Sequence, residues 1–124
     1  MEKQVNIADY LDSTYLKTAD EAGISEQETK EIVINSIQEA IQSKFACIMI
    51  RPEFVAMAKE VIESNKSKLK VGTVIDFPFG NQATAIKVSE AKSAIENGAY
   101  DIDYVCDYNA FKRGSFEKFD NDIV

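Results

Sequence analysis

The chain has 124 residues, with 14 lysine and arginine and 21 aspartate and glutamate side chains, for a formal net charge of −7. This length predicts one domain, and its acidity makes the chain a poor ligand for nucleic acid and for anionic membranes. It has no histidine, which excludes Ser-His-Asp and Cys-His catalysis and histidine metal sites.

Two cysteines, Cys47 and Cys106, are too few for a disulfide framework or a cysteine-rich zinc site. Each lies in an apolar run, which predicts a buried, reduced thiol. The charged N-terminus lacks the apolar segment of a secretory signal, and no stretch is apolar for long enough to span a membrane. These features predict a cytoplasmic domain.

The first half of the chain alternates short apolar runs with a helical pattern. A weak pattern predicts a strand over residues 10–16. Ser25 and Glu28 form an S-x-x-E capping box at the start of a helix predicted over residues 25–43. The continuous apolar run 45–50 is typical of a strand buried on both faces.

The second half continues the alternation. Pro52 suits the first turn of the next helix, and residues 70–77 predict a third strand. Val88, Ala91 and Ile95 predict the apolar face of a helix over 83–97, which Gly98 ends. A fourth strand is predicted over 101–106, and a helical segment begins at residue 116.

This order, β-α-β-α-β-α-β, predicts an α/β fold with parallel strands in a single domain over residues 1–124. Two architectures fit: a small doubly wound sheet, or four βα units of an eight-stranded barrel. No G-x-G-x-x-G and no P-loop follows a strand, which weakens the doubly wound alternative.

Two carboxylates interrupt the fourth predicted strand. The period of two places Asp101 and Asp103 on one face together with Val105. A carboxylate buried in a sheet costs several kcal/mol, by rough estimate, unless it is paired. One of them could cap a loop or pair with a lysine, or the pair could serve acid–base chemistry inside a barrel. The residues alone leave both alternatives open.

Other polar residues stand near the ends of predicted strands. Asp12, followed by serine and threonine, could simply bond to the local backbone. Asp76 and Phe77 end the third strand, where they could cap a loop or form the wall of a site at the carboxyl-end rim of a barrel.

A histidine-free enzyme could instead use a lysine Schiff base, which requires a desolvated lysine. Lys17 follows the first strand, Lys70 opens the third, and Lys87 lies in a helix. We interpret all three as solvated or salt-bridged, so the chain offers no convincing covalent nucleophile.

Three motifs in this order and spacing resemble those of the deoxyribose-phosphate aldolase family. The first is Tyr-Leu-Asp-Ser-Thr-Tyr-Leu-Lys at residues 10–17. The second is Thr-Val-Ile-Asp-Phe-Pro-Phe-Gly at 73–80, followed by Lys87 and Glu90. The third is Asn-Gly-Ala-Tyr-Asp-Ile-Asp-Tyr-Val at 97–105.

The resemblance implies a (β/α)8 barrel and a class I aldolase that needs no metal or other cofactor. Its members reversibly cleave 2-deoxyribose 5-phosphate to glyceraldehyde 3-phosphate and acetaldehyde through a lysine Schiff base. By resemblance, Asp103 belongs to the proton relay, and Asp12 supports the rim of the first strand. Two positions depart from the family: Met49 stands where some members have cysteine, and Tyr100 where an acidic residue is usual.

The family's Schiff-base lysine lies on the sixth strand, whereas this chain carries four predicted strands. We therefore expect an N-terminal half-barrel, truncated after strand four and inactive alone, whose family substrates are small phosphorylated sugars and aldehydes. The alternative is a non-catalytic half-barrel that self-associates as a homodimer or higher oligomer, because four strands leave open edges and an uncovered face.

Overall fold

A computed structural model describes residues 3–124, and its centre is one parallel sheet with the strand order β1-β2-β3-β4. The strands are β1 (Asp12–Tyr15), β2 (Cys47–Ile50), β3 (Lys70–Ile75) and β4 (Asp101–Tyr104). Sequential neighbours without a switch point exclude the doubly wound alternative and confirm the barrel type of sheet. Each strand is shorter than its predicted range.

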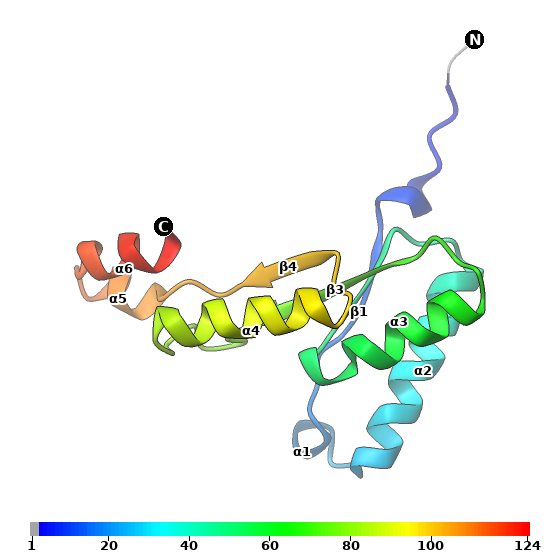
Figure 1. The fold of residues 1–124 in the computed structure, drawn as a ribbon, viewed down its shortest axis with the longest axis horizontal. Coiled ribbons are helices and arrows are strands. Elements are labelled where there is room, and N and C mark those ends of the chain that lie inside the picture. The colour runs from blue at the N-terminus through cyan, green and yellow to red at the C-terminus, as the bar shows by residue number, and fades with distance from the viewer. Residues whose placement is uncertain (1–2) are drawn as a thin grey trace.

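The connections between and after the strands are helical (Figure 1). Helix α2 confirms its prediction, including the capping box of Ser25 and Glu28. Three short elements were not predicted: η1, α1 and α5. In chain order the helices are η1 (Ile7–Tyr10), α1 (Ala19–Ala22), α2 (Glu26–Gln42), η2 (Pro52–Phe54), α3 (Val55–Ser64), α4 (Thr84–Glu96), α5 (Tyr108–Lys112) and α6 (Phe116–Ile123).

The hydrophobic core lies between one face of the sheet and helices α2 and α3. Ile48, Ile50 and Val71 point to this face from the middle of the sheet. The helices cover them with small and branched side chains: Val33, Ile37 and Ala40 from α2, and Val55, Ala58 and Ile62 from α3. Burial of this apolar surface stabilises the sheet and orients its strands.

Helix α4 differs from its prediction. Its predicted apolar face is largely exposed, with Val88 at 48% and Ile95 at 59% exposure, while Lys87 and Ala94 are buried. Lys87 instead points inward, and its ammonium is bound by the carbonyl oxygens of Gly80 and Val105 and by the carboxylate of Asp122. Val88 there faces Ile102 of β4 across an apolar hollow of about 210 Å3.

The helices that contact the sheet within residues 3–124 leave its other face without a helical layer. We call this surface the open face. The strand register assigns to it Asp12 and Thr14 of β1, Cys47 and Met49 of β2, Lys70, Gly72 and Val74 of β3, and Asp101 and Asp103 of β4.

Close packing in the middle of the open face depends on Gly72. A Cβ atom there would lie 2.6 Å from Cε of Met49 and 2.9 Å from Sγ of Cys47, so these two side chains fill the space above the glycine. Asp101 and Asp103 are exposed, and the predicted cost of burying them does not arise, because β4 is an edge strand.

None of the helices in residues 3–124 combines the length and the apolar content needed to cross a membrane.

Candidate active-site wall at the carboxyl ends of the strands

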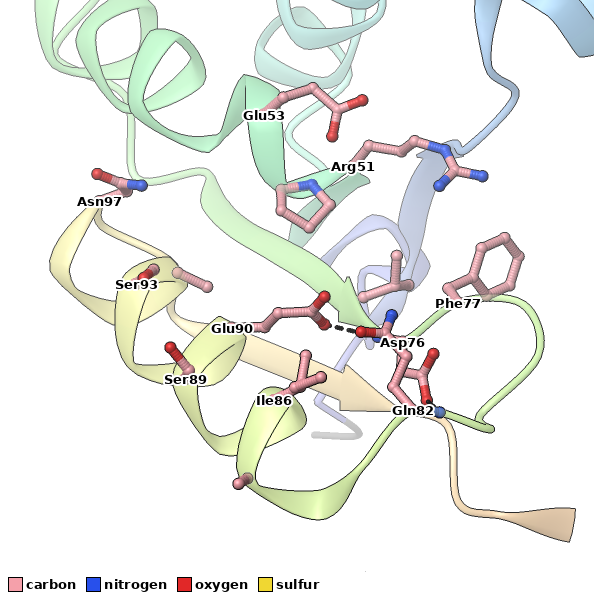
Figure 2. A pocket seen from close by; sticks show the side chains of 14 residues that line it. Arg51, Glu53, Asp76, Phe77, Gln82, Ile86, Ser89, Glu90, Ser93 and Asn97 are labelled. Carbon is pink, nitrogen blue, oxygen red and sulfur yellow. Dashed lines mark hydrogen bonds between the residues drawn. The ribbon is translucent and has the colours of Figure 1, made fainter.

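Asp76 directly follows β3 and is held in place by its neighbours. It is 7% exposed and adopts a left-handed conformation with φ of 52°. Its backbone N–H donates to the Glu90 carboxylate at 3.0 Å, the contact drawn in Figure 2. Its own carboxylate accepts from the Gln82 N–H at 2.9 Å. Asp76 therefore fixes the loop after β3, as the loop-cap alternative predicted.

Lys87 is hydrogen-bonded to the chain segments that follow β3 and β4. Its ammonium donates to the carbonyl oxygens of Gly80 at 2.9 Å and Val105 at 2.8 Å, and to the carboxylate of Asp122. The Asp76 carboxylate lies 3.6 Å away. Lys87 is salt-bridged, as one alternative predicted, but it is buried rather than solvated. An ammonium has three N–H donors, and all three have acceptors here.

Asp122 of α6 brings the last helix into this network. One carboxylate oxygen accepts from the Thr84 hydroxyl at 2.8 Å, and the other accepts from Lys87 and from the Asp107 N–H at 2.9 Å. Burial raises the pKa of the Asp122 carboxyl, but these hydrogen bonds outweigh burial, so its pKa lies below the ordinary value. The carboxylate is therefore held charged opposite Lys87.

The loop after β3 passes so close to the chain after β4 that only glycine fits. Gly80 has φ of 65°, and a Cβ atom on it would lie 2.2 Å from the carbonyl oxygen of Cys106. This contact fixes the position of the two loops relative to each other.

Arg51 joins the ends of the first three strands. It follows β2, and its Nε donates to the carbonyl oxygen of Leu16 at 2.7 Å. Its guanidinium lies 5.5 Å from the ring centre of Phe77, which is 38% exposed. Arg51 and Phe77 thus form part of the carboxyl-end rim, where sites form in barrels of this kind.

A groove of about 680 Å3 runs between η2 and α4 on the helical side of the sheet. Figure 2 shows Arg51, Glu53, Asp76 and Glu90 around it. Its walls carry charges of both signs, and α4 contributes more of the lining residues than any other element, six of 14.

The open face carries three exposed carboxylates, those of Asp12, Asp101 and Asp103. Cys47 lies among them. Burial raises the pKa of the Cys47 thiol to about 12, and the negative charges of all three aspartates add to the increase. Cys47 is therefore a neutral and unreactive thiol.

The predicted site residues do not form one cluster within residues 3–124. Asp103 lies beside Val74 towards the carboxyl ends of the strands, whereas Asp12 begins β1 and lies beside Cys47 at the amino ends. Asp76 turns to the helical side, and Phe77 lies at the rim. No group of three or more Cys, Asp or Glu side chains in this part of the chain is arranged to hold a metal ion.

Three polar residues of this region were missed from the sequence: Arg51, Asp107 and Asp122. Arg51 could have been found, because a charged residue directly after a buried strand stands at the rim. Asp122 gives no such signal, since its partner Lys87 is 35 residues away in the chain.

Sequential parallel βα units, with carboxylates on the face away from the helices and a fixed rim at the carboxyl ends, define an α/β protein of the (β/α)8-barrel class. The chain belongs to the DeoC/LacD family of aldolases, whose family description matches residues 10–120.

The names of similar proteins agree with this family. Deoxyribose-phosphate aldolase of Thermococcus gammatolerans is 38% identical over 119 residues, covering 96% of this chain and 49% of the relative. A crystal structure of a putative deoxyribose-phosphate aldolase from Coccidioides immitis matches 94% of the chain and 42% of its own length, with a TM-score of 0.79 and 29% identity. The tetrameric deoxyribose phosphate aldolase of Aeropyrum pernix matches 79% and 38%, with a TM-score of 0.65 and 30% identity.

The chain thus spans about half the length of the curated relatives it matches, such as 49% of the Thermococcus protein. The family match over residues 10–120 includes all four strands of the sheet. This coverage agrees with the half-barrel expected from the sequence.

Proposed function

We propose that this chain forms the N-terminal half of the active-site wall of an aldolase that cleaves 2-deoxyribose 5-phosphate to glyceraldehyde 3-phosphate and acetaldehyde. The observation that carries the proposal is Asp103, an exposed carboxylate on the face that becomes the interior when such a sheet closes into a barrel. The names of the relatives support the same reaction.

In this proposal Asp103 moves protons beside a Schiff-base lysine that a complementary half supplies. A carboxylate can take and return the protons of a retro-aldol cleavage, and enclosure in a barrel strengthens its interaction with a nearby ammonium. Asp12 lies on the same face as Asp103, Asp76 fixes the loop after β3 from the helical side, and Phe77 lies at the rim.

The chain alone is proposed to be inactive, because its lysines do not suit covalent catalysis. The ammonium of Lys87 is fully engaged by two carbonyls and a carboxylate. Lys17 is exposed, and the exposed Lys70 rests its ammonium 4.6 Å from the ring centre of Tyr100. A Schiff base requires a desolvated, unprotonated amine.

Borohydride trapping tests this directly. The chain is incubated with 2-deoxyribose 5-phosphate and borohydride, and its intact mass is measured. We expect the unmodified 13.8 kDa chain and no retro-aldol turnover. A single reduced adduct on the chain alone would overturn the proposal that the lysine comes from elsewhere.

Complementation tests the role of Asp103. The chain is mixed with a separately expressed C-terminal half of a full-length relative, and retro-aldol turnover is measured. We expect activity in the mixture and a loss of about 100-fold or more with Asp103→Asn, since a proton-transfer group contributes at least this much. Asp101→Asn, on the same strand and face, is the matched control and should cost much less.

We also propose that the chain self-associates through the open face, as a homodimer or a higher oligomer. The support is that both edges of the sheet are free, β1 on one side and β4 on the other. Light scattering at increasing protein concentration tests this, and a constant monomer mass would refute it. A cytoplasmic location completes the proposal, because both cysteines are free thiols.

A further inference from the structure

The side chain of Arg51 contacts the loops that follow β1 and β3 from its own place after β2. The side chain is only 15% exposed. Its Nε donates to the carbonyl oxygen of Leu16, directly after β1, at 2.7 Å. Its guanidinium lies 5.5 Å from the ring centre of Phe77, in the loop after β3 (Figure 2). One side chain therefore joins three consecutive loops at the carboxyl-end rim.

The same guanidinium reaches the short helix α1, which follows the first of these loops. Its Nη2 lies 4.0 Å from Oε2 of Glu21. That oxygen also accepts from the Thr18 N–H at 2.9 Å, and the Thr18 hydroxyl accepts from the Glu21 N–H at 3.2 Å. The pKa of Glu21 lies below its ordinary value, chiefly because of the hydrogen bond from Thr18, and the charge of Arg51 adds to the decrease. Arg51 thus favours the charged carboxylate that caps α1.

The geometry of an arginine side chain suits this position. Its nitrogens donate in one plane, so the group can bond Leu16, approach Glu21 and place its cation over an aromatic ring at the same time. Lysine has one nitrogen on a flexible chain and cannot make all three contacts together. Hydrogen bonds of the preceding residue already anchor the backbone of the loop after β3, so Arg51 acts on the ring of Phe77. All these contacts lie within residues 16–77, inside the range that matches the family.

We propose that Arg51 is a positioning residue of the active-site rim, which holds the loop after β1 and the ring of Phe77 in a fixed relation. Its consequence for substrate rests on the aldolase proposal above, whereas the linkage of the loops does not. Loops at the carboxyl ends of the strands bind substrate in barrels of this class. Proton transfer is assigned to Asp103, which β4 holds beside Val74 of β3. Loss of Arg51 should therefore weaken substrate binding more than the chemical step.

A tryptophan reporter measures the contact with the ring. The chain contains no tryptophan, so Phe77→Trp introduces a single fluorescent side chain at the rim. In this background Arg51→Gln removes the cation, and Arg113→Gln removes the charge of an exposed arginine as the matched control. Acrylamide should quench the reporter about two- to fivefold more efficiently in Arg51→Gln, the range expected from the loss of an exposed cation–π contact. The control should leave the quenching unchanged.

Hydrogen exchange measures the contact with the loop after β1, in chains that keep Phe77. The amides of residues 22–24 donate to the carbonyl oxygens of residues 18–20. These amides should exchange faster in Arg51→Gln than in the wild type, while the amides of β2 and β3 keep their protection and show that the variant is folded. Arg51→Lys keeps the charge but not the planar group, so it should not restore both the quenching and the exchange.

Complementation with the C-terminal half of a relative measures the consequence for substrate. Arg51→Gln should raise the KM for 2-deoxyribose 5-phosphate about two- to fivefold and leave kcat within about twofold of the wild-type mixture. A variant that merely folded less well would lower the amount of active complex, and hence kcat, without this change in KM. Asp103→Asn should show the opposite pattern, with the loss in kcat.

The outcomes separate the two proposals. Unchanged quenching and exchange in Arg51→Gln would overturn the linkage of the loops. Full recovery of both by Arg51→Lys would show that charge alone suffices, and would overturn the role of the arginine geometry. An active mixture with unchanged KM would overturn the positioning role and leave the aldolase proposal intact. A wild-type mixture without turnover would overturn the aldolase proposal and the consequence for substrate, whereas the linkage is decided on the chain alone.

Discussion

Replacing Lys87 by methionine should strongly destabilise the chain. Methionine has a similar length but carries no charge, so the buried carboxylate of Asp122 loses its counter-ion, and the carbonyls of Gly80 and Val105 lose their donor. Breaking a buried ion pair by removing one partner costs about 3–5 kcal/mol. Because small domains have only about 5–15 kcal/mol of stability in total, this is a large fraction.

Urea unfolding followed by far-ultraviolet circular dichroism measures this loss. Lys92→Met is the matched control, because Lys92 is an exposed lysine of the same helix and its replacement should change the free energy of unfolding by less than about 0.5 kcal/mol. The double variant Lys87→Met, Asp122→Leu should recover part of the loss, since neither buried charge then remains alone.

The reasoning would be refuted if Lys87→Met cost no more than the control. It would also be refuted if the double variant lost the sum of the two single losses or more, because the two side chains would then not be energetically coupled.

Three further predictions concern stability. Gly80→Ala should cost about 2 kcal/mol or more in thermal unfolding, because its Cβ would meet the carbonyl oxygen of Cys106 at 2.2 Å, whereas Gly114→Ala, with φ of 76° but open space, should cost less. Because the pKa of Asp122 is lowered in the folded chain, its carboxylate adds stability that is full above about pH 5 and is lost as the pH falls through that pKa. Urea unfolding midpoints should therefore fall with pH in the wild type, and they should fall less in Asp122→Asn. Ser25→Ala should cost about 1 kcal/mol in urea, since it removes the side-chain acceptor of the α2 capping box, and an unchanged midpoint would contradict this.

Sequence reasoning succeeded where structure depends on near neighbours. The capping box of Ser25 and Glu28 joins residues three apart, so the local sequence was enough to predict the start of α2. The alternation of apolar runs and helical patterns was enough to predict the order of strands and helices along the chain. Pro52, in the first turn of the next helix, was also placed correctly.

Long-range contacts and surface coverage could not be predicted in this way. The period of two placed Asp101 and Asp103 on one face, but it does not tell whether another layer covers that face. The apolar spacing of Val88 and Ile95 predicted a buried stripe, yet α4 instead buries Lys87, which pairs with distant Asp122.

The contact of Asp122 in α6 with Lys87 limits how far this chain can be shortened from its C-terminal end. A fragment ending after β4 would contain every strand and the full hydrophobic core, and would look complete by those measures. It would nevertheless leave the ammonium of Lys87 without the carboxylate of Asp122, and Thr84 without its acceptor. The shortest piece suitable for expression therefore extends at least through residue 122, well past the last strand.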